Sequence, residues 1–159
     1  MTREIADNLL NPALGAVLLA AFGHKWQEHA HDANIDPWKV FLVLPMALHQ
    51  PTVNQIATMR FQTGLEPALS SCPSIRSGLQ DRVSAFMSLS MRSILFADSC
   101  GWLSCGRDCR LHVDIAAHAV RGMHLPSSIK QRLRACERLA AWFPFYSTPQ
   151  LFALLGVRL

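Results

Sequence analysis

Phe41-Leu-Val-Leu-Pro-Met-Ala-Leu-His49, eight apolar residues closed by a histidine, decides the fold because so apolar a run has to be buried. Apart from His49, none of its side chains can donate a proton, attack a carbon atom or bind a metal ion. Asp36-Pro37 predicts the start of its helix. Pro45 predicts a kink, because it removes one backbone hydrogen bond and its ring clashes with the preceding turn. His49 is expected to cap the helix C-terminus, where the dipole favours the cationic imidazole.

Helices are also predicted on both sides of this stretch. Asn11-Pro12 predicts the N-terminus of a helix that runs to about His29. Two short, weakly patterned helices are expected at 52–59 and 66–69. A longer helix with one buried face, closed by Gly101, follows from apolar and small residues repeating at intervals of three and four: Val83, Phe86, Met87, Ser90, Met91, Ile94 and Leu95.

After Gly101 the apolar period changes to two. Leu103, Cys105, Cys109, Leu111 and Val113 alternate with polar residues about Gly106-Arg-Asp108, which predicts two strands joined by a tight turn. A helix that leads into such a hairpin predicts a winged-helix-like unit with Arg107 at the wing tip.

Zinc binding by Cys100, Cys105, Cys109 and His112 is the alternative interpretation of this region. Their spacing does not give paired C-x2-C knuckles, and Cys105 and Cys109 fit equally well as inward strand residues.

The last third of the chain is predicted to be helical. Residues 116–123 have a helical pattern, and Pro126-Ser-Ser128 is expected to cap the next helix. That helix has an apolar stripe, while Lys130, Arg132, Arg134 and Arg138 are expected on its other faces. Thr148-Pro149 should cap a final helix over 150–155, ended by Gly156. The fold class is therefore mainly α with a small β-hairpin, in one domain over 1–159: a helical core at 11–100, the hairpin at 102–114 and C-terminal helices at 128–155.

Length and composition agree with one domain that has a partner. A chain of 159 residues suits a single core. With 50% apolar and 16% charged residues, part of its apolar surface is expected to be covered by another subunit. No apolar run is long enough to span a membrane, and no signal peptide is recognised, so a cytoplasmic protein without a membrane partner is expected. Five cysteines, an odd number, then favour reduced thiols.

Positive charge is concentrated in the second part of the chain. Residues 1–59 carry three basic and five acidic side chains, a net charge of −2, whereas residues 60–159 carry twelve and six, a net charge of +6. Such a surface suits phosphate, an acidic protein or only solvent. The candidate nucleic-acid contacts are Arg92, Arg107, Arg110, Lys130 and Arg134.

Motifs of catalysis and cofactor binding are absent from the sequence. There is no nucleophile elbow, Walker loop, dinucleotide-binding turn or zinc-protease motif. Cys72, Cys100 and Cys136 lack a recognisable histidine partner, so neither catalysis nor a cofactor is expected. The cluster His29-Ala-His31-Asp32 invites a metal interpretation, but a solvated loop is favoured because side chains two apart do not share a helix face.

Three segments carry a resemblance to a known family: Asn11-Pro-Ala-Leu-Gly-Ala-Val-Leu-Leu19, residues 41–52 and Phe152-Ala-Leu-Leu-Gly-Val-Arg158. In this order they resemble the middle component of three-component ABC-ATPase systems, a group that includes the Lamassu defence systems. The resemblance implies a small non-enzymatic subunit that assembles with an SMC-like ABC ATPase and an effector, often a nuclease. It further implies an anti-phage or anti-plasmid complex triggered by DNA ends or unusual DNA structures.

The leading hypothesis is an adaptor that docks on the ATPase and holds the effector inactive until double-stranded DNA is engaged through the complex. Its hydrophobic C-terminal part supplies the expected subunit interface: Trp142, Phe145, Phe152, Leu155, Val157 and Arg158. The alternative hypothesis is a stand-alone winged-helix DNA-binding regulator, for which Arg107 and Arg110 would contact the duplex.

Overall fold

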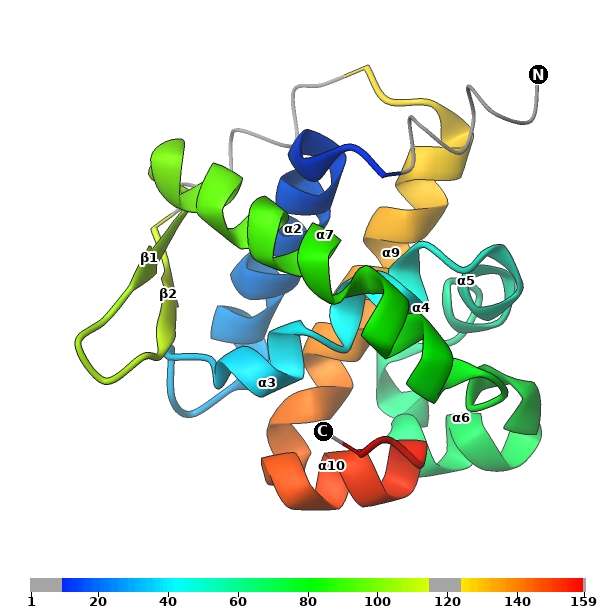
Figure 1. Ribbon diagram of the computed structural model, residues 1–159. Coiled ribbons are helices and arrows are strands. Elements are labelled where there is room, and N and C mark those ends of the chain that lie inside the picture. Colours follow the sequence, from blue (N-terminus) through cyan, green and yellow to red (C-terminus); the bar gives the residue numbers. More distant parts are fainter. Residues whose placement is uncertain (1–9, 115–123, 159) are drawn as a thin grey trace.

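The computed structural model describes residues 10–114 and 124–158 and shows a mostly helical domain with one small hairpin (Figure 1). A single hydrophobic cluster runs through the described residues. The predicted fold class, mainly α with a hairpin, is confirmed, and the winged-helix-like unit remains a prediction. The elements are α2 (Pro12–His29), α3 (Pro37–Val40), α4 (Val43–Ala47), α5 (Gln50–Ile56), α6 (Leu65–Ser71), α7 (Leu79–Ser99), β1 (Leu103–Cys105), β2 (Leu111–Val113), α9 (Ser127–Trp142) and α10 (Thr148–Leu155).

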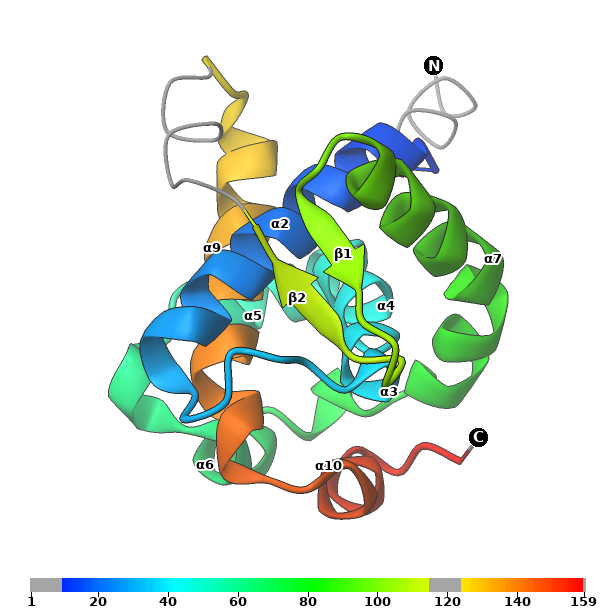
Figure 2. The same ribbon diagram turned by 90° about the vertical axis from the view of Figure 1, so that its left-hand side faces the viewer.

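Helix α2 lies at the centre and packs against both α7 and α9 (Figures 1 and 2). Its predicted start and end are confirmed: the side chain of Asn11 accepts a hydrogen bond from the backbone N–H of Ala13, and the helix ends at His29. It is buried on more than one face, because Leu18, Leu19 and Phe22 are all almost fully enclosed. A helix that is apolar around much of its circumference is stable only when other elements surround it.

Phe41–Leu48 is buried in the core, as predicted, and His49 is half-buried, but the stretch does not form one kinked helix. The helical path is interrupted at Phe41 and Leu42, which separate α3 from α4. Pro45 has no N–H to offer the carbonyl of residue 41, so the break falls one turn before the proline rather than at it. His49 does not end a helix either: it precedes α5 as the N-cap residue.

The pKa of His49 is lowered, first by burial and second by the charge of Arg82. The expectation of a favoured cationic imidazole is therefore wrong. Its Nδ1 lies 2.8 Å from the hydroxyl oxygen of Thr52.

The hairpin follows α7 where the sequence predicts it. Gly101 has a φ of 70° and closes the helix, and β1 pairs with β2 in the register Leu103↔Val113 and Cys105↔Leu111. Leu111 also bridges Ile35 in the loop before α3, which fixes the hairpin against the α2–α3 connection. The hairpin rests on α2, because the methyl groups of Val113 lie where a side chain at Gly23 would project.

Two expectations about the C-terminal helices need correction. Arg132 does not lie on a solvated face of α9: it is buried and donates hydrogen bonds to the carbonyl oxygen of Ala47 and to Oε1 of Gln50, both at 2.8 Å. The cap of α10 is Ser147, which forms a capping box with Gln150, rather than the predicted Thr148-Pro149.

The termination of α10 at Gly156, in the left-handed conformation, is confirmed. The helix predicted over 116–123 lies entirely outside the described residues. Among the helices that the structure does describe, none combines the length and the apolar composition needed to cross a membrane.

Candidate functional site

An apolar groove with a volume of about 550 Å³ lies between α3, α7 and the hairpin. Figure 2 looks onto the hairpin, with α3 near its turn and α7 beside it. No charged side chain lines the groove. The lining residues are Pro37, Trp38, Phe41, Met87, Met91, Ile94, Leu95, Cys105, Cys109 and Leu111.

Three large apolar side chains of this groove project into solvent. Leu95 is 63% exposed, Met91 50% and Trp38 48%. The rings of Trp38 and Phe41 are tilted by 46° to each other, with 5.8 Å between their centroids, and both line the groove. Scattered exposed apolar side chains are ordinary on a protein surface, but several that line one concave site mark a place where another molecule binds.

Helix α7 leaves its side chains Met91 and Leu95 uncovered because it buries small residues against α2. Ser90, Ser93 and Ala97 are fully enclosed. At Gly15 of α2 an added Cβ atom would lie only 2.0 Å from Oγ of Ser93, so the two helices touch almost backbone to backbone.

The predicted buried face of α7 is therefore wrong for Met91 and Leu95. The periodic pattern placed the large apolar residues inside, whereas the contact with α2 is made by the small ones. The small residues at positions 90, 93 and 97, opposite a glycine, are the signal by which the sequence could have shown this.

Cys105 and Cys109 also line the groove. Both thiols are exposed, so the prediction that they point into the core is wrong, whereas Leu103, Leu111 and Val113 are buried as expected. Cys105 ends β1, and Cys109 lies in the turn with a φ of 60°, where strand alternation no longer applies. Within residues 10–114 and 124–158, no three side chains of His, Cys, Asp or Glu are grouped so that they could hold a metal ion.

The five basic residues considered for nucleic-acid contact are all exposed but come from three separate elements. Arg107 and Arg110 lie in the hairpin turn, Arg92 on α7, and Lys130 and Arg134 on the first turns of α9. In Figure 1 the hairpin turn and the start of α9 lie on opposite sides of the molecule, so the structure does not gather these residues into one patch. Arg110 is also engaged within the chain, since its Nη1 lies 2.6 Å from a carboxylate oxygen of Asp32.

The six residues expected at a subunit interface divide into two groups. Trp142, Leu155 and Val157 are buried in the core of the chain, and the indole N–H of Trp142 donates to the carbonyl oxygen of Phe61 at 2.8 Å. Phe145, Phe152 and Arg158 reach the surface to different degrees, and Phe145 is 77% exposed. The exposed members are therefore the ones that could contact a partner in this conformation.

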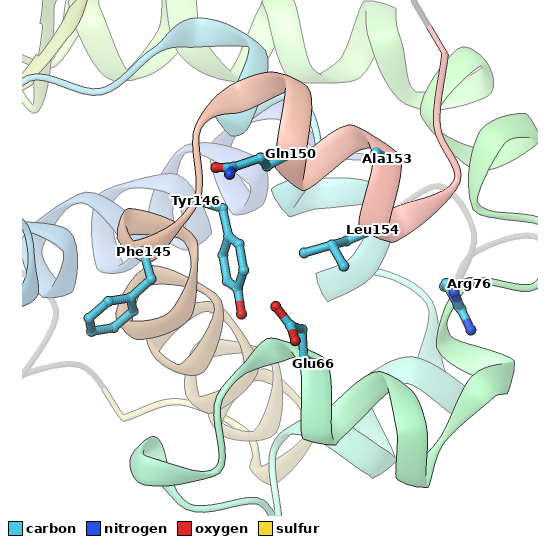
Figure 3. A pocket seen from close by; sticks show the side chains of 7 residues that line it. All are labelled: Glu66, Arg76, Phe145, Tyr146, Gln150, Ala153 and Leu154. Atoms are coloured by element: carbon cyan, nitrogen blue, oxygen red, sulfur yellow. The ribbon is translucent and has the colours of Figure 1, made fainter.

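Phe145 lies at the edge of a second pocket, with a volume of about 540 Å³, between α6 and α10 (Figure 3). Unlike the groove, this pocket is lined by side chains of both charges, Glu66 and Arg76. In Figure 3 the hydroxyl of Tyr146 points toward the carboxylate of Glu66, and Leu154 separates this pair from Arg76. Gln150 and Ala153 complete the lining.

The buried ionisable groups serve the fold rather than chemistry. The ammonium group of Lys39 donates to the carbonyl oxygens of Phe143, at 3.4 Å, and Tyr146, at 2.6 Å, and burial lowers its pKa. Burial likewise raises the pKa of the Cys136 thiol far above its ordinary value. Because the thiolate is the reactive form of cysteine, Cys136 is poorly suited to be a nucleophile.

The comparisons with known proteins give one match. The family model described as ABC-three component (ABC-3C) system Middle Component 3 matches residues 2–159. No curated protein and no solved structure gives a significant match to the chain. The predicted resemblance to the middle component of a three-component ABC system is confirmed by this match over almost the entire chain.

Proposed function

Because the chain belongs to the ABC-three component system Middle Component 3 family, we propose that it is a non-catalytic adaptor that docks on the ABC ATPase subunit of its system. The observation that carries the proposal is the match over residues 2–159. It is supported by the groove between α3, α7 and the hairpin, which presents several large apolar side chains to solvent at one concave site.

The groove has the properties of a protein-binding site. Aromatic residues and methionine are enriched at the centres of protein interfaces, and Trp38, Phe41, Met87 and Met91 all line this cavity. We assign the groove to apolar side chains of the ATPase subunit.

From the resemblance of the three sequence segments we further propose that the ATPase is SMC-like and that the third component is an effector nuclease. The complex then acts in Lamassu-type anti-phage or anti-plasmid defence. Double-stranded DNA reaches the complex as its trigger, and the adaptor holds the nuclease inactive until then. The scattered exposed arginines and lysines are more compatible with auxiliary DNA contact within such a complex than with a continuous DNA-binding face on the isolated chain.

The experiment is co-expression of the chain with the ABC ATPase and effector subunits of its own system, followed by affinity purification through a tag on the chain. The ATPase is expected to co-elute at moderate salt and to remain bound through size-exclusion chromatography. A Met91→Asp variant, which puts a charge into the groove, is expected to lose the ATPase, and Asp98→Asn on the same helix should retain it. If the wild-type chain eluted alone, the adaptor function would be wrong.

A further inference from the structure

The pocket beside Phe145 carries an inference that rests on the proposed adaptor function. We propose that it binds a peptide segment of a partner subunit in which a basic side chain and an acidic side chain flank an apolar one. The basic side chain pairs with Glu66, the acidic one reaches Arg76, and the apolar one packs on Leu154 between them (Figure 3).

The two charges of the pocket are the first argument. Glu66 and Arg76 line the same cavity, yet they form no ion pair with each other or with any other residue among those the structure describes. Both side chains are exposed, and Figure 3 shows Arg76 on the far side of Leu154 from the Glu66–Tyr146 pair. Two opposite charges on either side of an apolar floor select a ligand with the complementary pair of charges.

The aromatic side chains of the pocket are the second argument. Phe145 is 77% exposed and Tyr146 lies next to it. A cation beside an aromatic ring gains from the negative face of the ring, which suits lysine or arginine at the Glu66 end. The pKa of Tyr146 is raised, first by burial and then by Glu66, so its hydroxyl stays neutral at physiological pH.

The shape of the surrounding surface indicates an extended segment rather than a single small molecule. A neighbouring cavity of about 220 Å³ shares Glu66, Arg76 and Leu154 with the pocket. On the other side Phe145 borders a further cavity of about 240 Å³. Cavities that share lining residues in this way can hold successive side chains of one peptide. A nucleic acid is disfavoured because its phosphates would meet the carboxylate of Glu66.

The test measures the affinity of each purified partner subunit, the ABC ATPase and the effector, for variants of the full chain by isothermal titration calorimetry. Glu66→Lys is expected to raise the Kd for one partner about tenfold or more, and Phe145→Ala is expected to raise the Kd for the same partner. The matched control is Asp81→Lys. Asp81 is the acidic residue of the first turn of α7, as Glu66 is of α6, so both reversals change the charge by the same amount at a helix start.

The possible results separate this inference from the proposed function. If the wild-type chain bound its partners and both Glu66→Lys and Phe145→Ala bound them equally well, the pocket assignment would be overturned while the adaptor function stood. An equal loss for Asp81→Lys would also overturn it, because the effect would then be long-range charge. A dimer of the isolated chain that Glu66→Lys dissociates would replace the partner segment by a second copy. Binding of neither partner by the wild-type chain would remove both the function and this inference.

Discussion

Replacing Leu95 on α7 by alanine separates the stability of the domain from the proposed binding role of its groove. Leu95 is 63% exposed in the isolated chain. Fully burying a leucine side chain is worth about 1.5–3 kcal/mol, so covering the exposed part of Leu95 with a partner is worth about 1–2 kcal/mol. The expected loss on truncation is therefore about 5- to 30-fold in the Kd for the ABC ATPase subunit.

Leu89 on the same helix is the matched control, because the same substitution there acts on the core. Leu89 is only 3% exposed. Its truncation leaves a cavity and should lower the free energy of unfolding by about 2–5 kcal/mol. Leu95→Ala, in contrast, should change that free energy by no more than about 0.5 kcal/mol.

Urea denaturation followed by circular dichroism gives the free energies of unfolding, and titration calorimetry with the ATPase subunit gives the Kd values. The reasoning would be refuted by a Leu95→Ala variant that is as unstable as Leu89→Ala, or by one that binds the ATPase with unchanged affinity. The first result would mean that Leu95 is core, and the second that the groove is not the docking surface.

Three further predictions concern the rest of the molecule. Gly15→Ala should lower the free energy of unfolding, measured by urea denaturation, by about 1–3 kcal/mol, because the new methyl group meets the side chain of Ser93. This loss is expected although alanine has the better helix propensity. A second substitution in the same chain, Ser93→Gly, should recover part of the loss. Burial and then Arg82 lower the pKa of His49, so the folded state binds fewer protons than the unfolded one. The stability contributed by neutral His49 should therefore be lost as the pH falls from about 6.5 through the lowered pKa. A His49→Gln variant should flatten this part of a profile of Tm against pH. Cys136 should resist maleimide in the native protein and react only in urea, as mass spectrometry of the labelled peptides would show, and rapid native labelling would contradict its burial.

Sequence patterns predicted most elements because their signals are local. Asn11-Pro12 starts α2, Gly101 closes α7 and Gly156 closes α10, each through a cap or a left-handed residue that depends only on neighbours along the chain. The hairpin followed from alternation and a glycine at its turn. Local rules of this kind act wherever the segment lies in the fold.

The errors arose where distant segments decide. Arg132 is buried because the carbonyl oxygen of Ala47 and the side-chain amide oxygen of Gln50, both more than 80 positions away, accept hydrogen bonds from its guanidinium group. Met91 and Leu95 are exposed because α7 packs against α2 through Ser93, opposite Gly15, so that the face with Met91 and Leu95 is turned away from α2. The groove combines α7 and the hairpin, which follow one another in the chain, with α3, which ends at Val40, far before α7 begins at Leu79. No local spacing pattern could therefore identify it, although the excess of apolar residues predicted that such a surface exists.

The position of α2 has a consequence for how the chain is made. Its apolar surface is covered in large part by α9, which begins at Ser127, almost a hundred residues after α2 ends at His29. At about 5–20 residues per second, the ribosome needs roughly 5–20 s to deliver the second helix after the first has been synthesised. During that interval Leu18, Leu19 and Phe22 lack one of their covering surfaces. The nascent chain is thus expected to depend on a chaperone or the ribosome surface until α9 emerges, so the subunit can be handed to its complex only after α9 has been synthesised.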